Sequence, residues 1–298
     1  MGVDPAIEAV RAFNRTVTQR VGALDDHYLS RRRPLGEARV LWEIGDDGCD
    51  VRVIRSRLGL DSGYLSRLLR ALETAGLVKV TAGELDKRVR TARLTRKGKA
   101  ERALLDERSD ALARSMLDPL TAAQRERLVA AMSEVDRLLT AALVEIDTVD
   151  PADHDAQWCL REYFTELDRR FSTGFDPATS RLPDPIEMRP PAGVFLVARL
   201  RGDPVGCGGL KFHDGDEPTE LKRMWVSPLA RGLGVGRRLL ADLETRAAQH
   251  GTTKLRLDTN SALTEAIAMY RASGYREVRP FNDEPYADHW FEKRLRPS

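Results

Sequence analysis

The length and composition of this chain predict two globular domains and argue against several other classes of protein. Its 298 residues are 42% hydrophobic and 32% charged, so each of two ordinary domains could bury a core. No run of 18 apolar residues and no basic-then-apolar N-terminus is present, so we expect neither a transmembrane helix nor a signal peptide. The three cysteines are widely spaced, which argues against a disulfide framework or a zinc site and favours a reducing cytoplasm.

Basic charge is concentrated in one short part of the chain. Residues 51–100 hold 13 Lys and Arg against 4 Asp and Glu, a net charge of +9, whereas the whole chain carries +2. Such a concentration is typical of a surface that binds nucleic acid.

The first elements are predicted to be helices. Residues 5–32 repeat apolar side chains at spacings of three and four, which predicts a long helix with one apolar stripe. The stripe is longer than a small domain can cover alone, so we expect a partner helix. Further helices are predicted over 35–44 and about 50–58, and Asp61 is a candidate N-cap for a helix over 62–75.

Two short helices joined by a tight turn, the second rich in Ser, Tyr and Arg, indicate a helix-turn-helix. Strands are predicted at 77–80 and 89–94, with Lys87 and Arg88 in the loop between them. A long polar helix is expected from Thr95 to about Leu117, and another from Thr121.

This order of elements resembles the MarR family of dimeric winged-helix regulators. Three motifs carry the resemblance: YLSRLLRALETAGLV at 64–78, Asp86-x-Arg88 in the predicted wing, and Leu94-Thr95-x-x-Gly98. The resemblance covers about residues 5–142 and implies a homodimer that binds double-stranded DNA; the plainer alternative is a basic helical interaction module. The side chains expected at the DNA are Ser62, Tyr64, Ser66, Arg67, Arg70, Lys87, Arg88 and Arg90.

The pattern changes at Leu143, so we expect one domain at 1–142 and a second at 143–298. The second domain is predicted to contain a strand at 143–148, a helix that includes 158–167, and an irregular proline-rich segment at 172–193. The remaining expected elements are strands at 194–200, 205–212, 220–226, 254–258, 275–278 and 290–295, and helices at about 237–250 and 262–272.

The stretch from Glu220 to Leu240 constrains function most. It begins as a strand, with Leu221, Arg223 and Trp225 expected on one face. A glycine-rich turn at 231–236 then leads into a helix, which presents unpaired N–H groups and a positive dipole end to an anion such as a pyrophosphate. A P-loop would need a Gly-Lys-Ser/Thr ending, and a Rossmann turn would need a βαβ crossover in place of the preceding hairpin.

Arg231-x-x-Gly234-x-Gly236, after a strand that ends in Val226-Ser227-Pro228, closely resembles the acetyl-CoA motif of the GNAT N-acetyltransferases. The order of elements over 143–296 is also that of the GNAT fold, an α/β fold with a mixed, mostly antiparallel sheet. The resemblance implies acetyl-CoA as co-substrate, an unknown amine acceptor, no metal and no membrane. The residues implied at acetyl-CoA are Met224, Trp225, Val226, Arg231, Gly232, Leu233, Gly234, Val235, Gly236, Arg237 and Asn260.

The same resemblance implies two catalytic residues. Tyr270 falls where many family members carry a tyrosine that protonates the leaving thiolate, and Glu220 where several carry a glutamate that acts as base. The simpler interpretations are that Tyr270 only packs under the sheet and that Glu220 faces solvent beside Lys222. Neither the acceptor nor the operator can be identified from the sequence.

Three functional hypotheses follow. In the first, a mainly α winged-helix regulator is fused to an active acetyltransferase; in the second, the GNAT domain is an idle acetyl-CoA sensor. In the third, the winged helix serves only to dimerise an enzyme. Tyr270 and Glu220 argue against the second hypothesis, and the basic segment with Arg67, Arg70 and Arg88 argues against the third.

Overall fold

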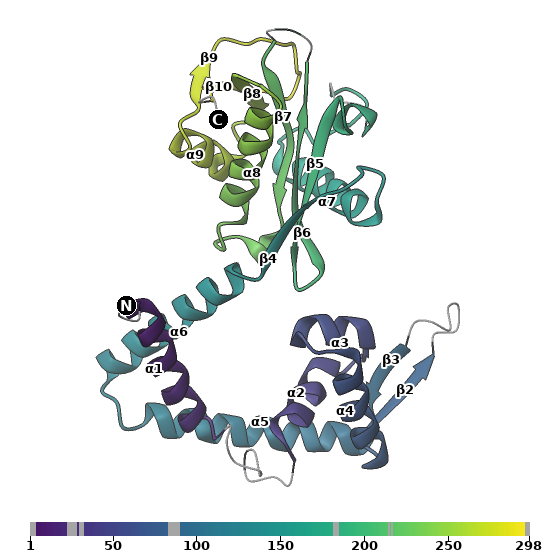
Figure 1. The fold of residues 1–298 in the computed structure, drawn as a ribbon, viewed down its shortest axis with the longest axis vertical. Coiled ribbons are helices and arrows are strands. Elements are labelled where there is room, and N and C mark those ends of the chain that lie inside the picture. The colour runs from purple at the N-terminus through teal and green to yellow at the C-terminus, as the bar shows by residue number, and fades with distance from the viewer. Residues whose placement is uncertain are drawn as a thin grey trace. The chain divides into compact units, whose positions relative to one another are not determined.

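The computed structural model describes residues 4–22, 29, 33–82, 90–180, 185–213, 215 and 217–295. The chain forms two compact units, Met1–Ala131 and Met132–Ser298; their elements are labelled in Figure 1. The division falls inside one continuous helix, α6 (Ala122–Ala141). The sequence-based boundary at 142/143 lies at the end of that helix.

The first unit is mainly helical and contains a small antiparallel sheet. Its helices before α6 are α1 (Pro5–Arg20), α2 (Leu35–Ile44), α3 (Val51–Leu58), α4 (Ser62–Thr74) and α5 (Arg96–Leu117). The sheet has the order β1-β3-β2, from β1 (Cys49–Asp50), β3 (Arg90–Leu94) and β2 (Val78–Ala82). The predicted helix-turn-helix and two-stranded wing are therefore confirmed, and β1 is a strand that the sequence analysis missed.

Local signals explain the helix-turn-helix. The Asp50 side chain accepts from the N–H of Arg52 and caps α3, and the Asp61 side chain accepts from the N–H of Tyr64 at 2.8 Å and caps α4. The buried face of α4 consists of leucines at helical spacing, which pack into a core with α2, α3 and the sheet. These leucines are Leu65, Leu68, Leu69 and Leu72. The opposite face of α4 is consequently left for solvent or a ligand.

The predicted helix over 5–32 is shorter in the structure. α1 ends at Arg20, and residues 23–28 and 30–32 of the predicted span lie outside the described residues.

The second unit is built on a seven-stranded sheet in the order β4-β5-β6-β7-β8-β10-β9. The strands are β4 (Val144–Thr148), β5 (Gly193–Leu200), β6 (Asp203–Lys211), β7 (Thr219–Val226), β8 (Lys254–Thr259), β9 (Arg276–Val278) and β10 (His289–Arg294). Neighbouring strands are antiparallel except β7 and β8, which pair in parallel. The predicted mixed, mostly antiparallel sheet is confirmed.

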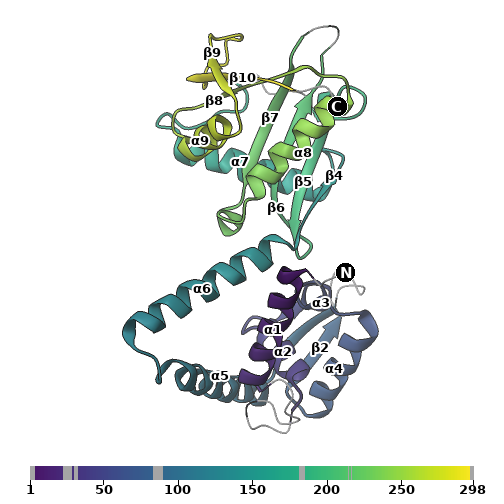
Figure 2. The same cartoon turned by 60° about the vertical axis from the view of Figure 1, so that its left-hand side comes forward.

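Helices cover both faces of this sheet (Figures 1 and 2). α7 (His154–Arg170) packs on one face, and α8 (Val235–Gln249) and α9 (Thr264–Ala272) pack on the other. β5 shows how the strands serve both layers: Leu196 packs with the α8 side, whereas Phe195 packs with the α7 side. A strand with apolar residues on both faces reads as a continuous apolar run, which is why this strand was predictable.

β7 does not keep one alternation along its length, and the predicted shared face of Leu221, Arg223 and Trp225 is wrong. Leu221 packs in the cluster on the α8 side, whereas Trp225 packs in the cluster on the α7 side. The cause is a bulge: the β6–β7 register shifts between Cys207 and Gly209, and Arg223 has a φ of +58°. One extra residue in a strand reverses the faces beyond it.

β7 and β8 part after two residue pairs. Thr219 pairs with Leu255 and Glu220 pairs with Arg256, and the parallel pairing ends there within the strands that the structure describes. β7 nevertheless continues to Val226. Its edge facing β8 therefore offers backbone hydrogen-bonding groups to a ligand.

No helix in the described part of the chain is long and apolar enough to cross a membrane.

Candidate functional site

A cavity of about 990 Å³ lies in the second unit, beside the free edge of β7. Its walls come from the end of β7, the glycine-rich turn, α7, α9 and the C-terminal end of α6. The structure brings ten of the eleven residues predicted at acetyl-CoA to this one cavity, together with Tyr270: Met224, Trp225, Val226, Arg231, Gly232, Leu233, Gly234, Val235, Gly236 and Arg237. The cavity is large enough for an elongated ligand.

The glycine-rich turn fits an anion. Gly234 is the N-cap of α8 in the left-handed conformation, with φ +76°, and no side chain caps this helix. The N–H groups of the first turn therefore point outward with the positive end of the helix dipole behind them. A Cβ on Gly232 or Gly234 would meet no atom within 4 Å, so the space in front of the turn is open to a phosphate.

Glu166 is a buried carboxylate in the cavity that the sequence analysis did not identify. Arg231 donates to both of its oxygens, at 2.6 and 2.5 Å, and the indole N–H of Trp225 donates to one of them at 2.9 Å. Arg170 adds a longer contact of 3.3 Å. Arg231 also donates to the Val226 carbonyl at 3.2 Å. Glu166 thus joins α7 to the end of β7 and to the turn, and Arg231 is directed toward this carboxylate.

A second, smaller cavity of about 80 Å³ adjoins the first. The two share six lining residues: Tyr163, Leu167, Met224, Leu263, Ala266 and Tyr270. The proline-rich segment and the C-terminal loop both reach the smaller cavity, through Phe175 and Tyr286, whose ring centroids are 4.9 Å apart. Two ligands, one in each cavity, would therefore meet beside Tyr270 and Met224.

Tyr270 lies at this junction and is 5% exposed. Burial, together with the nearby negative charge of Asp258, raises the pKa of Tyr270 above its usual value. Burial and the neighbouring Tyr270 and Asp258 likewise raise the pKa of Tyr163. Both phenols accordingly keep their protons at neutral pH, as a proton donor must.

Glu220 lies apart from both cavities. Its carboxylate accepts from Arg256 at 2.7 Å and lies 3.2 Å from the ammonium of Lys222. Burial opposes its ionisation, but the charges of Lys222 and Arg256 outweigh burial and lower the pKa of Glu220. A carboxylate held in this way is a weak proton acceptor.

Asp258 is a carboxylate that lines the smaller cavity, which Glu220, the expected base, does not. It accepts from Lys222 at 2.6 Å and from Asn282 at 3.2 Å. Burial lowers the pKa of Lys222, but the charges of Asp258 and Glu220 outweigh this and raise it. Lys222 therefore stays charged between the two acids.

Asn260 lines the smaller cavity and not the larger one. Its amide donates to the Tyr286 carbonyl at 2.8 Å, and its side-chain oxygen accepts from the N–H of Ala262. It thereby holds the C-terminal loop against the end of β8.

The residues that sequence reasoning missed at these cavities are Tyr163, Glu166, Arg170, Lys222 and Asp258, whereas Glu284 and Tyr286 belong to a C-terminal segment that was expected to shape the acceptor pocket. A charged residue on the apolar side of a helix, such as Glu166 in α7, was the one local signal available.

A separate candidate surface lies on α4 in the first unit. Ser62, Tyr64, Arg67 and Arg70 are exposed there, Ser66 is half-buried, and Arg90 is exposed at the start of β3. The Arg67 guanidinium lies 5.6 Å from the Tyr64 ring centroid, and Arg70 donates to the Ser66 hydroxyl. Lys87 and Arg88 lie outside the described residues. The predicted α4 side chains therefore share one solvent-facing side.

Within the described ranges, no group of three or more His, Cys, Asp or Glu side chains could hold a metal ion.

Comparisons with known proteins divide the chain in two. Residues 158–275 match the model of the Acetyltransferase (GNAT) family, and residues 31–89 match that of the MarR family. An IAA acetyltransferase of Azospirillum brasilense is 38% identical over 121 residues, covering 41% of this chain and 78% of that protein. An uncharacterized N-acetyltransferase of Schizosaccharomyces pombe is 29% identical over 133 residues, covering 44% and 80%.

A GNAT-family acetyltransferase structure from Staphylococcus aureus has a TM-score of 0.44 and 20% identity, and covers 51% of this chain and 99% of its own.

The glycine-rich turn makes a direct prediction. Gly234→Trp should abolish measurable acetyl-CoA binding in calorimetry, because the new side chain would fill the space in front of the α8 N-terminus. Gly251→Trp is the matched control, since Gly251 also has positive φ and open space but lies at the other end of α8. Wild-type affinity in Gly234→Trp would contradict this location for the cofactor.

Proposed function

This chain belongs to the GNAT family of acetyltransferases and carries a MarR family domain ahead of the GNAT domain, and on that premise we propose that it is both an enzyme and a DNA-binding regulator. The enzyme transfers an acetyl group from acetyl-CoA to the amine of a small molecule or protein. The regulator binds double-stranded DNA as a homodimer.

One observation carries the enzymatic proposal: two adjoining cavities share Tyr270 and Met224. The larger one extends to the turn before α8 and suits a long cofactor with a phosphate end. The smaller one suits the acceptor amine. A transfer reaction needs both reactants to meet at a defined point, and these two cavities provide one.

Acetyl-CoA supplies an acetyl group activated as a thioester. In our proposal, the N–H groups of the turn at 231–236 bind its pyrophosphate, with Arg237 near by. The free edge of β7 at Met224–Val226 hydrogen-bonds its amide-containing arm. Tyr270 donates a proton to the departing sulfur, because its phenol lines both cavities and is protonated at neutral pH.

The acceptor must lose a proton before its nitrogen can attack. We infer that Asp258 receives this proton, directly or through water, since it lines the acceptor cavity. Glu220 was the sequence-based candidate, but its carboxylate lines neither cavity and accepts from Arg256. Its contribution is then to hold Lys222 beside Asp258.

The acid role is tested at Tyr270. Tyr270→Phe keeps the ring and its packing but lacks the donor, so turnover should fall by about 10²–10⁴-fold, the usual contribution of general acid catalysis. Acetyl-CoA affinity should stay close to that of the wild type. Mass spectrometry with a panel of amines finds a working acceptor, and steady-state kinetics then measure the loss.

Two further variants make this test specific. Tyr163→Phe removes the other phenol at the junction and should leave turnover within a few-fold of wild type; a large loss there with an active Tyr270→Phe would assign the acid to Tyr163.

Glu220→Gln should reduce turnover less than Asp258→Asn does. The reverse order would return the base role to Glu220.

The DNA-binding proposal is supported by the exposed side of α4 and by the basic segment around it. Lys87 and Arg88 of the wing and Arg90 belong to the same proposal.

Each phosphate contact contributes about 0.9 to the slope of log affinity against log salt concentration. Arg67→Ala should therefore weaken binding to sheared genomic DNA and flatten that slope by about one contact, measured by fluorescence anisotropy. Arg114→Ala, on α5, should leave the slope unchanged.

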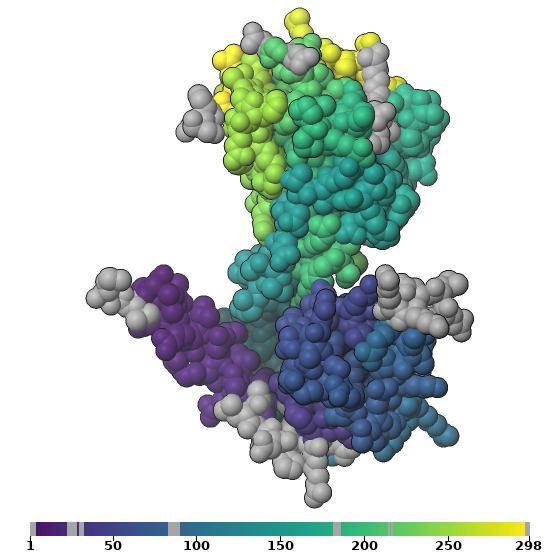
Figure 3. Space-filling view, turned by 45° about the vertical axis from the view of Figure 1, so that its right-hand side comes forward, coloured from purple at the N-terminus to yellow at the C-terminus, as the bar shows by residue number. Residues whose placement is uncertain are grey.

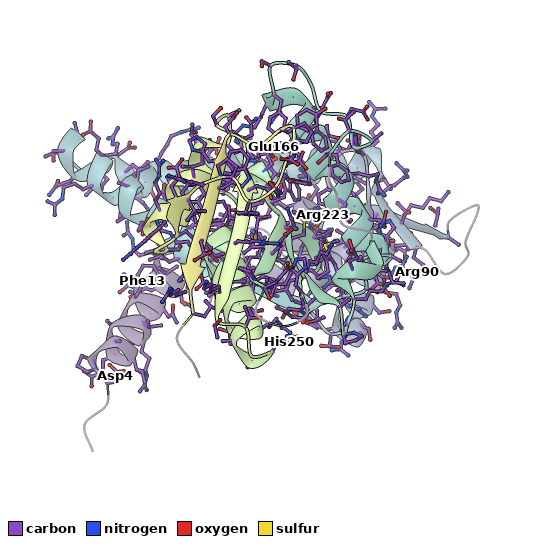
Figure 4. All side chains as sticks on the ribbon, turned by 90° about the horizontal axis from the view of Figure 1, so that it is seen from above. Asp4, Phe13, Arg90, Glu166, Arg223 and His250 are labelled. Carbon is purple, nitrogen blue, oxygen red and sulfur yellow. The ribbon has the colours of Figure 1, made fainter. Side chains whose placement is uncertain are left out.

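Homodimer formation is supported by two helices whose apolar sides are left uncovered. No residue of α1 or α6 is buried in the part of the chain that the structure describes. Val10 and Phe13 of α1 are 59% and 47% exposed, and Met132 and Leu139 of α6 are exposed too. Figure 3 shows α1 in purple with much of its surface uncovered, and Figure 4 labels Phe13 on it. A second copy of the chain would cover these sides.

Phe13→Asp should convert the dimer to a monomer in light scattering, because a charge would be buried at the interface. Asn14→Asp adds the same charge on the same helix and should leave the dimer intact. A monomeric wild type, or a dimer that survives Phe13→Asp, would contradict pairing through α1.

The same kinetics distinguish the active enzyme from the second hypothesis, an idle GNAT domain that senses acetyl-CoA. It requires cofactor binding without acetyl transfer to any amine in the panel. The pair of cavities favours the active enzyme, since a sensor does not need an acceptor cavity.

A further inference from the structure

The C-terminal half of α6 forms part of the larger cavity. Arg137, Leu138 and Ala141 line it together with the glycine-rich turn. These residues precede the first strand of the acetyltransferase fold, β4, which starts at Val144. The helix that leads out of the MarR region therefore contributes a wall to the acetyl-CoA site.

Arg137 contacts the turn directly. Its Nη1 donates to the carbonyl of Gly232 at 2.7 Å, and its other side donates to Glu134 through Nε at 2.9 Å and Nη2 at 2.6 Å. Arg238, in the first turn of α8, donates to the carbonyls of Ala141 and Val144 at 2.8 and 2.7 Å. The end of α6 is thus bonded to both the turn and the helix that follows it.

The Arg137 guanidinium donates to the glycine-rich turn through one nitrogen and to the surface carboxylate of Glu134 through the others. Such a guanidinium can exchange the carboxylate for another anion. Arg137 and Glu134 are about half exposed, so their ion pair contributes little stability in water. The pyrophosphate of acetyl-CoA carries two negative charges against one on a carboxylate, and it accepts the same pair of parallel N–H groups. An anion bound in front of the turn would compete with Glu134 for Arg137.

We propose that Arg137 is a ligand of the acetyl-CoA phosphates, that Glu134 occupies its guanidinium when the cofactor is absent, and that α6 thereby responds to cofactor binding. The proposal rests on acetyl-CoA binding in the proposed function. α6 runs without a break from Ala122, in the first unit, to Ala141, in the second. A continuous helix transmits a restraint at one end along its hydrogen-bonded backbone. Cofactor binding therefore restrains the part of α6 whose uncovered apolar side is proposed for dimerisation.

Calorimetry of acetyl-CoA binding to the full chain tests the ligand exchange. Arg137→Ala should weaken affinity about tenfold, as expected for loss of one charge-assisted hydrogen bond to a phosphate. Glu134→Gln should tighten affinity, because the competing carboxylate is removed. Arg127→Ala, an exposed arginine elsewhere on α6, should bind like the wild type.

The two substitutions are expected to change acetyl-CoA affinity in opposite directions. If the ion pair only stabilised α6, both Arg137→Ala and Glu134→Gln would weaken binding or leave it unchanged, and either result would overturn the proposal. S-acetylpantetheine, which lacks the nucleotide, should bind Arg137→Ala and the wild type equally. A wild type that binds no acetyl-CoA would instead refute the proposed function itself.

Hydrogen exchange measures the response of α6. Saturating acetyl-CoA should slow amide exchange over 122–131 as well as over 132–141 in the wild type and in Arg127→Ala. In Arg137→Ala, saturated with cofactor to the same extent, the slowing over 122–131 should be lost. Protection confined to 132–141 in the wild type would overturn the transmission along the helix.

Discussion

The parting of β7 from β8 is the constraint on which the second unit depends. Two parallel pairs, Thr219–Leu255 and Glu220–Arg256, join the strands, and among the described residues β7 then continues to Val226 paired with β6 only. A strand edge without a partner leaves polar backbone groups unsatisfied, which is unfavourable in a buried site unless a ligand or water satisfies them. The opened edge therefore offers backbone groups to a ligand, and both cavities lie along it.

The bulge at Arg223 divides β7 into two parts that pack on opposite faces of the sheet. Before it, Leu221 packs on the α8 side, and after it Trp225 packs on the α7 side, where its indole N–H donates to Glu166. A buried carboxylate is tolerated only when it is paired and hydrogen-bonded. Glu166, labelled in Figure 4, meets this requirement through Arg231 and Trp225 and thereby ties α7, β7 and the turn together.

Each of the two units contains one of the domains that the comparisons find in the chain. In the first unit, the leucines of α4 face the core, and this leaves its Ser, Tyr and Arg side chains outward. In the second, the phenols of Tyr163 and Tyr270 line both cavities, and Asp258 lines the smaller one. α6 belongs to both: its Arg137 side chain donates to the turn, and its Ala141 carbonyl accepts from Arg238 of α8.

The sequence by itself determined the elements and motifs that depend on near neighbours. The Asp61 cap, the leucine spacing of α4, the glycine-rich turn and the position of Tyr270 are all readable, because helix and strand periods and cap chemistry act over a few residues. The tertiary structure decided which distant groups meet. Arg231 finds Glu166 in α7, Arg137 finds the Gly232 carbonyl, and Arg256 engages the Glu220 that had been expected to act as base. The reversal of faces along β7 also required the structure, since a bulge depends on the partner strand, and no local pattern records where β7 carries its extra residue.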